Sequence, residues 1–291
     1  MRDLVIGLLH PGEMGTAVAG CLAGLGHTVL WASDGRGPAT ASRAREAGLS
    51  DAGTVAELAG RSDIILSICP PHAAVEVARS VATPAATAAA GFRGVFVDAN
   101  AISPATSRTV AGIIEAGGGS YVDGGIIGLP PTSAGATRLY LSGQRADEIR
   151  DLFTGTIVDA KIVDGRVGAA SAVKMAYAAW TKGTAALLLA ARALASAEGV
   201  QDALLAEWAL SQPALAEGTR SAARSAAVKG WRWVAEMEEI ADSMAAAGLP
   251  PGFHQAAAEV FRRQPRAASA DAATATATVE EVLEALLAGA Q

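Results

Sequence analysis

The feature that most restricts the fold of this chain is a regular alternation of apolar runs and helix-like segments before residue 164. The runs lie at 4–9, 28–32, 63–69, 94–100, 120–127, 138–143 and 157–163. Near-continuous apolar runs are typical of strands buried on both faces, and those separated by helices of about ten residues indicate βαβ units. The sequence therefore predicts an α/β domain built on a parallel sheet.

The first of these runs leads into the segment His10-Pro11-Gly12-Glu13-Met14-Gly15. In the dinucleotide-binding fingerprint G-x-G-x-x-G, the first glycine makes a tight turn, the second admits the pyrophosphate and the third packs helix on strand. Here only the first glycine is replaced, and histidine is among the residues enriched at positive φ. Because a strand precedes the segment and a helix follows, we expect all six residues to bind a dinucleotide at the helix N-terminus.

The residues after the second run should select the cofactor. An acidic residue there binds the ribose diol of NAD, whereas a small polar residue and an arginine accommodate the 2′-phosphate of NADP. Ser33 occupies the selecting position and Arg36 lies close enough to reach back. We therefore expect NADP(H), although the carboxylate of Asp34 keeps NAD(H) as the alternative.

The second half of the chain has a different character. Strand patterns end near residue 164, and 167–198 is an Ala/Leu-rich stretch without proline. As one helix it would be about 48 Å long, and it is apolar nearly all round. So few residues follow that they can hardly cover such a helix, which predicts a homodimer interface. We thus expect a Rossmann domain over 1–163 and an all-α substrate and dimerisation domain over 164–291, whose tail begins with an Ala/Thr-rich linker and ends in a short amphipathic helix.

Bulk composition excludes several classes of partner. Of the 291 residues 51% are apolar, yet no run is long enough to span a bilayer, and the N-terminus does not fit a secretion signal. The net charge of −6, without basic clusters, argues against nucleic acid and anionic membranes as partners. Cys21 and Cys69 are expected to be reduced thiols of a cytoplasmic protein, and no Cys/His group has metal-ligand spacing. A small-molecule substrate fits these observations.

Two segments of the first half carry a family resemblance. "IGLLHPGEMG" (6–15) resembles the opening motif IGFIGLGNMG of the β-hydroxyacid dehydrogenase superfamily, which includes 3-hydroxyisobutyrate and 6-phosphogluconate dehydrogenases. "DANAISP" (98–104) resembles its D-x-S-T-I-S-P loop near the nicotinamide. The resemblance implies that Cys69, Pro70 and Asn100 line the cofactor, and that Asn100 takes part in catalysis through a hydrogen bond to the carboxamide or the substrate.

Two further segments resemble the substrate side of that superfamily. "VDGGIIGLP" (122–130) resembles the segment that holds the substrate carboxylate, with Gly128 matched and Ile127 in place of serine. "GAASAVKM" (168–175) resembles the helix start that carries the catalytic lysine, which falls on Lys174. The family's asparagine four residues later is Ala178 here. Further on, in 229–261, a Lys-Asp pair becomes Ala235-Glu236, so a charged carboxylate substrate should be disfavoured.

These residues suggest a hydride-transfer enzyme with Lys174 as general acid/base. Tyr177 lies three residues on, hence on the same helix face, and could support Lys174 or bind substrate, or simply pack in the core. His254 is the next candidate, although a structural role is the simpler interpretation. Besides a dehydrogenase or reductase of carbonyls and hydroxy acids, the sequence leaves two alternatives: an imine reductase and a non-catalytic NADP(H)-binding redox sensor.

Overall fold

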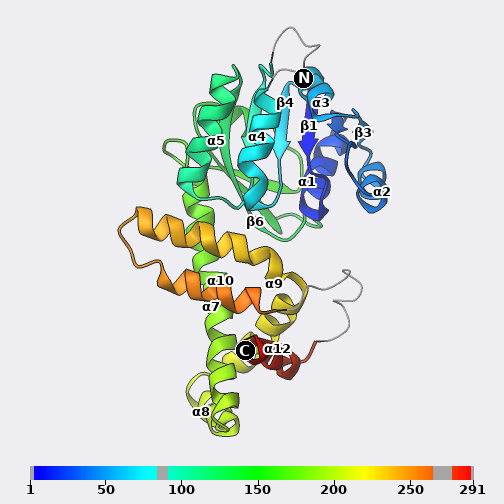
Figure 1. Ribbon diagram of the computed structural model, residues 1–291. Coiled ribbons are helices and arrows are strands. Elements are labelled where there is room, and N and C mark those ends of the chain that lie inside the picture. The colour runs from blue at the N-terminus through cyan, green and yellow to red at the C-terminus, as the bar shows by residue number, and fades with distance from the viewer. Residues whose placement is uncertain (1–2, 84–90, 265–276, 290–291) are drawn as a thin grey trace. The chain divides into compact units, whose positions relative to one another are not determined.

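The computed structural model describes residues 3–83, 91–264 and 277–289. The chain forms two compact units, Met1–Met175 and Ala176–Gln291. The first is an α/β unit and the second is entirely helical in its described part (Figure 1). The predicted fold class, a Rossmann domain followed by an all-α domain, is confirmed.

An eight-stranded sheet with the order β3-β2-β1-β4-β5-β6-β7-β8 forms the centre of the first unit. Its strands are β1 (Val5–Leu9), β2 (Thr28–Trp31), β3 (Ser50–Asp51), β4 (Ile64–Ser67), β5 (Val95–Asp98), β6 (Ser120–Gly128), β7 (Thr137–Ser142) and β8 (Val158–Ile162). The first six are parallel, and the chain order reverses between β1 and β4. Ligands of open α/β sheets bind at such a switch point, outside the carboxyl ends of the strands.

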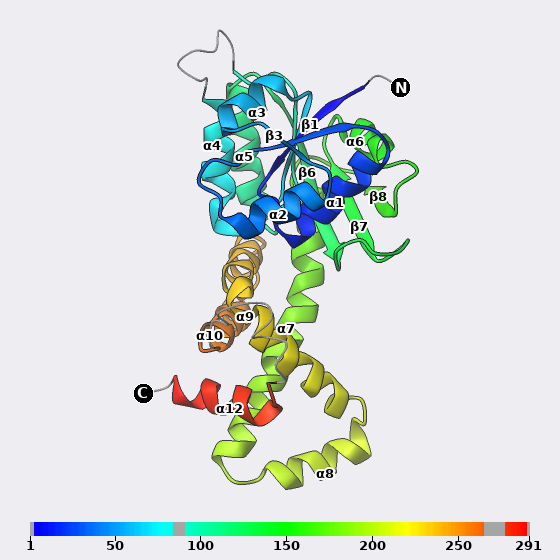
Figure 2. The same ribbon diagram turned by 90° about the vertical axis from the view of Figure 1, so that its right-hand side faces the viewer.

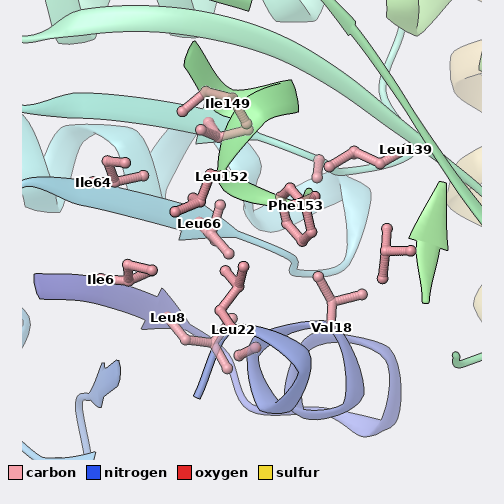
Figure 3. Packing of buried hydrophobic residues seen from close by; sticks show 14 of the residues in the cluster. Ile6, Leu8, Val18, Leu22, Ile64, Leu66, Leu139, Ile149, Leu152 and Phe153 are labelled. Atoms are coloured by element: carbon pink, nitrogen blue, oxygen red, sulfur yellow. The ribbon is translucent and has the colours of Figure 1, made fainter. Parts of the chain in front are cut away.

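Helices cover both faces of this sheet (Figure 2). They are α1 (Glu13–Gly24), α2 (Pro38–Glu46), α3 (Val55–Arg61), α4 (Ala74–Ala82), α5 (Pro104–Ala116) and α6 (Ala146–Leu152), with a 3₁₀ turn, η1, at Pro71–Ala73. On one face, Ile6 and Leu8 of β1 pack with Val18 and Leu22 of α1 (Figure 3). On the other, alternate strand residues pack against α3, α4 and α5. The central strands β1, β4, β5 and β6 thus bury both of their faces, as their apolar runs predicted.

The sheet differs from the sequence prediction at its two edges. β7 runs antiparallel to β6, whereas the sequence predicted a parallel sheet throughout. The chain connects β6 to β7 without a crossover helix, and a short connection joins antiparallel strands. β3 was not predicted, because its two residues are exposed and show no apolar pattern.

The second unit contains most of α7 (Ala169–Ala197), followed by α8 (Gln201–Ser211), α9 (Leu215–Ala246), α10 (Gly252–Arg262) and α12 (Val279–Ala288). The long helix predicted over 167–198 is therefore present. The short C-terminal helix is also present, whereas the predicted linker before it lies mostly outside the described residues. Within the described ranges, no helix has the length and apolar character needed to cross a membrane.

Candidate active site

The fingerprint turn lies at the carboxyl end of β1, next to β4 at the switch point. His10 has a φ of 70°, the one positive φ outside glycine among the described residues. Its carbonyl oxygen accepts a hydrogen bond from the Gly12 N–H at 2.7 Å. Histidine therefore makes the tight turn that the missing glycine would have made.

The second and third glycines keep the space that the fingerprint requires. Gly12 is the N-cap of α1, without a side-chain cap, and a Cβ on it would meet nothing within 4 Å. A Cβ on Gly15 would lie 2.8 Å from the His10 carbonyl oxygen, so only glycine at position 15 lets α1 pack this closely on the turn. The start of α1 presents its first-turn N–H groups and the positive end of the helix dipole, which suits it to an anion.

The residues after β2 form a turn that returns toward the fingerprint. The Arg36 N–H donates to the Ser33 carbonyl oxygen at 3.0 Å, and Gly35 supplies the positive φ of 69°. The Arg36 guanidinium Nη2 lies 2.7 Å from Nε2 of His10. Ser33 and Arg36 are thus beside the fingerprint, whereas the exposed Asp34 N–H donates toward Gly53.

Asn100 links the ends of β4 and β5. Its Oδ1 accepts from the Cys69 N–H at 2.5 Å, its Nδ2 donates to Ser67 Oγ at 3.2 Å, and its own N–H donates to Asp98. Burial and the nearby carboxylate of Asp98 raise the pKa of the Cys69 thiol to about 12, so this cysteine is a neutral thiol near pH 7. Asn100 therefore fixes the strand ends that face the cofactor edge.

A buried carboxylate on β6 fastens the start of α7. Asp123 Oδ2 accepts from the N–H groups of Gly168 and Ser171, both at 3.0 Å, and from Ser142 Oγ at 2.8 Å. Its Oδ1 accepts from the hydroxyls of Ser107 at 2.8 Å and Ser171 at 2.5 Å. Helix N-termini leave N–H groups unsatisfied and attract negative charge. Asp123 therefore stabilises α7 both by accepting hydrogen bonds from its N-terminal N–H groups and by placing a negative charge there.

Lys174 lies on the second turn of α7, close to β6. A Cβ built on Gly125 would lie 3.0 Å from Lys174 Cβ and 2.9 Å from the Ala170 carbonyl oxygen. A Cβ on Gly124 would lie 2.7 Å from the Asp98 carbonyl oxygen. The two glycines thus let both α7 and the end of β5 pack closely on β6, and half-buried Lys174 belongs to the first unit.

The proposed substrate residues of β6 differ in exposure. Ile127 is buried and paired with Arg138 of β7, whereas Gly128 is exposed with a φ of 121°. A Cβ on Gly128 would lie 2.0 Å from the Ala136 carbonyl oxygen. An apolar, branched side chain therefore occupies the position at which the resemblance places a serine.

The other predicted residues belong to the second unit. Tyr177 is 46% exposed, so core packing does not account for its ring. His254 is buried on α10, with its Nε2 3.3 Å from the Ala179 carbonyl oxygen and against Gly183, where a Cβ would lie 3.3 Å from the same nitrogen. This packing suits the structural interpretation of His254.

Two charged residues that the sequence analysis did not single out, Arg43 and Lys182, also make contacts with side chains or backbone of interest. Arg43 of α2 donates from Nε to the Pro11 carbonyl oxygen at 3.5 Å. In the second unit, Lys182 of α7 forms an ion pair with Glu236 of α9 and lies 5.4 Å from the ring centre of Trp233. No local sequence pattern marked Arg43, because its contact with Pro11 depends on how α2 packs beside the fingerprint.

The family assignment follows from comparison with known proteins. Residues 5–153 match the NAD binding domain of 6-phosphogluconate dehydrogenase, and the chain belongs to this family. Residues 195–264 match a domain of unknown function, DUF1932. The resemblance to the hydroxyacid dehydrogenase superfamily, seen in the motifs, is thereby confirmed.

Individual relatives are distant. An uncharacterized 28.5 kDa protein of Methanothermus fervidus is 28% identical over 171 residues, which are 59% of this chain and 63% of that protein. The chain thus spans less than two thirds of this relative. The structure of the conserved protein MTH1747, described as similar to 3-hydroxyacid dehydrogenases, is 27% identical with a TM-score of 0.66, over 89% of this chain and 96% of that one.

Two enzymes share the fold at lower identity. Mycobacterium tuberculosis 3-hydroxyisobutyrate dehydrogenase with L-serine is 20% identical with a TM-score of 0.66, over 98% of this chain and 99% of that one. An Aspergillus terreus reductive aminase, in complex with NADPH, cyclohexanone and allyl amine, is 19% identical with a TM-score of 0.56, over 97% and 99%. Their similarity establishes a common architecture.

Proposed function

We propose that this protein is an NADP(H)-dependent oxidoreductase that acts on a small carbonyl, hydroxy-acid or imine substrate. One observation carries the proposal: the dinucleotide fingerprint and Lys174 occur in the same unit, the first beside β1 and the second on α7, where the helix packs against β6. A fingerprint alone would fit a binding protein, whereas a half-buried lysine at the start of α7 adds a proton donor.

The fingerprint fits the cofactor's phosphates. Space in front of Gly12 and the N–H groups of Glu13, Met14 and Gly15 suit a pyrophosphate, with His10 and Pro11 forming the turn. Cys69, Pro70 and Asn100 border the same carboxyl edge and would lie along the nicotinamide half. The bound cofactor would supply or accept the hydride, and the protein would orient the reactants and move the proton.

The cofactor's 2′-phosphate would be recognised by Ser33 and Arg36. The guanidinium of Arg36 lies next to the fingerprint, while the Asp34 carboxylate is the group that would favour NAD(H). The test is titration of the protein with NADPH and with NADH. Tighter binding of NADH would contradict the preference and assign Asp34 to the ribose.

Lys174 would give a proton to the developing alkoxide or amine, and take it back in the reverse reaction. Its stem is held against Gly125 of β6, and Asp123 fixes the helix that carries it. Asn100 would orient the carboxamide or substrate oxygen. Tyr177, one turn further along α7, would assist Lys174 or contact the substrate.

The substrate would be less charged than a β-hydroxy acid. Buried Ile127 offers no hydrogen-bond donor to a carboxylate, which leaves the backbone around Gly128 as the remaining donor there. The test compares kcat/KM for 3-hydroxyisobutyrate with that for an uncharged ketone and an uncharged imine of similar size. A clear preference for the acid would contradict this proposal, and a preference for the imine would favour an imine reductase.

The alternative function is that of a non-catalytic redox sensor, which would bind NADP(H) without turnover. The altered positions His10, Ile127 and Ala178 motivate it, while Lys174 argues against it. Oxidation of NADPH in the presence of a mixed carbonyl and imine library separates the two. Binding without oxidation of NADPH would support the sensor.

The assembly that we propose is a homodimer formed through α7. Its side chains Trp180, Leu187 and Leu194 are 75%, 65% and 64% exposed and recur every seven residues. A repeat of seven keeps apolar residues on one face of a helix, as in helices that pair. We also propose that residues 1–163 bind the cofactor and that residues 164–291 serve substrate binding and dimerisation. The proposed location is the cytoplasm.

A further inference from the structure

We propose that His10 is a positioning residue for NADP(H) selectivity, because its ring holds the Arg36 guanidinium in place to receive the 2′-phosphate. The inference rests on the proposed NADP(H) preference. The contact joins two residues 26 positions apart, with Arg36 Nη2 2.7 Å from His10 Nε2. The residue that departs from the fingerprint is thus the one that touches the arginine.

The turn fixes the ring to the backbone of the phosphate site. The φ of 70° and the 2.7 Å hydrogen bond from the Gly12 N–H define the orientation of the His10 main chain. Gly15 packs on the same carbonyl group from the other side. The backbone of the turn therefore sets the direction of the His10 side chain relative to the start of α1. The Arg36 guanidinium, which contacts the ring, is positioned with it.

The ring is in the correct protonation state for this contact. Burial and the charge of Arg36 lower the pKa of His10 to about 4, so the imidazole is neutral near pH 7. An arginine donates only, hence Nε2 accepts and the proton lies on Nδ1. The guanidinium has five N–H donors, of which this contact uses one, and the others remain for phosphate oxygens.

A second guanidinium reaches the same turn. Arg43 donates from Nε to the Pro11 carbonyl oxygen at 3.5 Å and from Nη2 to Thr40 Oγ1 at 3.2 Å. Arg36 and Arg43 are thus both attached to the His10-Pro11 pair, one through a ring and one through a carbonyl. Two guanidinium groups suit a phosphate monoester, which carries close to two negative charges.

Holding an arginine in advance has an energetic benefit. An arginine side chain loses considerable rotamer freedom when it is fixed by a ligand, and a contact formed before binding removes part of that cost. The benefit applies to ligands that carry the 2′-phosphate. NADH and AMP, which lack it, gain nothing from the contact.

The experiment measures dissociation constants of the full-length protein for NADPH and NADH, and for the fragments 2′,5′-ADP and AMP. His10→Gly removes the ring but keeps the positive φ, and His10→Gln restores an acceptor of similar reach. We expect His10→Gly to weaken NADPH and 2′,5′-ADP by about tenfold, with NADH and AMP changed less than about twofold. His10→Gln should recover most of the loss, and His10→Gly should add nothing in the Arg36→Ala background.

Three results would overturn the inference. Equal weakening of NADPH and NADH by His10→Gly would reduce His10 to a turn-forming residue. Unchanged NADPH binding would show that Arg36 needs no support, and tighter binding would show that the ring masks the arginine. Failure of the underlying cofactor preference is separate, because it is measured with His10 in place: NADH binds tighter, or Arg36→Ala leaves NADPH unaffected.

Discussion

In the first unit the buried carboxylate of Asp123 accepts five hydrogen bonds, whereas in the second unit the buried guanidinium of Arg192 has an Nε–H with no partner among the described residues. His254 Nδ1 and Gln264 Oε1 of the second unit likewise have none in that part of the chain. Among the residues that the structure describes, large exposed apolar side chains follow the same division, with three in the first unit and nine in the second. Buried polar groups are normally hydrogen-bonded, and apolar patches mark interaction sites.

The clearest difference between the two units is therefore in exposed apolar side chains, since each unit has some buried polar atoms without a described partner. Two such atoms of the first unit, His10 Nδ1 and Thr16 Oγ1, lie at the start of α1. The second unit exposes more large apolar side chains, which the homodimer that we propose would bury. Function in the first unit should therefore depend on individual polar residues, and in the second on apolar area.

The largest effect should come from substitution of Lys174, the proposed proton donor. This prediction tests whether the catalytic residue lies in the first or the second unit. Lys174→Met should lower turnover by about 10²–10⁴, the usual contribution of a positioned general acid, and leave the cofactor dissociation constant unchanged. Steady-state rates with the best substrate of a carbonyl and imine panel provide the measurement, and Lys161→Met on the exposed β8 is the control. A loss below about threefold would move the donor to Tyr177 or His254, and so to the second unit.

The second effect concerns the apolar face of α7. The double variant Leu187→Glu/Leu194→Glu should raise the dimer dissociation constant by about 10²–10⁴, since each buried leucine contributes about 1.5–3 kcal/mol. Sedimentation velocity over a range of concentrations measures it. Leu210→Glu on α8, where the leucine is 84% exposed and lies off α7, is the matched control and should leave assembly intact. A monomeric wild type at micromolar concentration would refute the interface.

A third effect tests the polar anchor of the first unit. Asp123→Asn should lower the free energy of unfolding by about 3 kcal/mol, because it removes the negative charge at the start of α7 and leaves one acceptor oxygen where the carboxylate has two. Urea denaturation provides the value. The exposed Asp147→Asn, which loses only a surface ion pair with Arg150, should cost under about 0.5 kcal/mol. Equal costs for the two would mean that buried hydrogen bonds do not distinguish the first unit.

The smallest effect is a pH dependence at the fingerprint. The pKa of His10 is lowered to about 4 from 6.5, so between these values the unfolded chain binds a proton that the folded chain refuses. The free energy of unfolding should therefore fall as the pH drops from 6.5 to 4, and this contribution should be absent above pH 7. His10→Gly should flatten that part of the stability profile, because it removes the group whose pKa is lowered. An unchanged profile in His10→Gly would contradict the assignment.

The sequence predicted the architecture well because strand and helix periods repeat along it. The fingerprint, the strands of the first unit except β3, and the long helix were found from local patterns. The direction of β7 was not, since a run such as 138–143 has the same appearance in either orientation. Side-chain placement also depends on the fold: the Asp123 contacts span up to 48 residues and the Lys182–Glu236 pair spans 54.

The sequence predicted those parts of the site whose residues lie close together along the chain. The sequence placed Arg36 near the fingerprint, because a short turn joins it to β2. It gave no sign that the ring of His10 is what Arg36 contacts, or that Arg43 reaches Pro11, because both contacts depend on how β1 and β2 lie side by side.

Because Asp123 fixes α7 at its N-terminal end, a tilt of the helix about that point displaces distant residues more than near ones. Asp123 holds the first turn of α7, and Lys174 is about 8 Å from that point at 1.5 Å per residue, whereas Leu194 is about 38 Å away. A tilt of about 5° about the anchor would move the lysine by about 0.7 Å but the leucine by about 3 Å. The position of Lys174, our proposed proton donor, is therefore less sensitive to a tilt of α7 than the position of Leu194 in the proposed dimer interface. Amino-acid changes that tilt the helix should alter the proposed assembly more than the proposed catalysis.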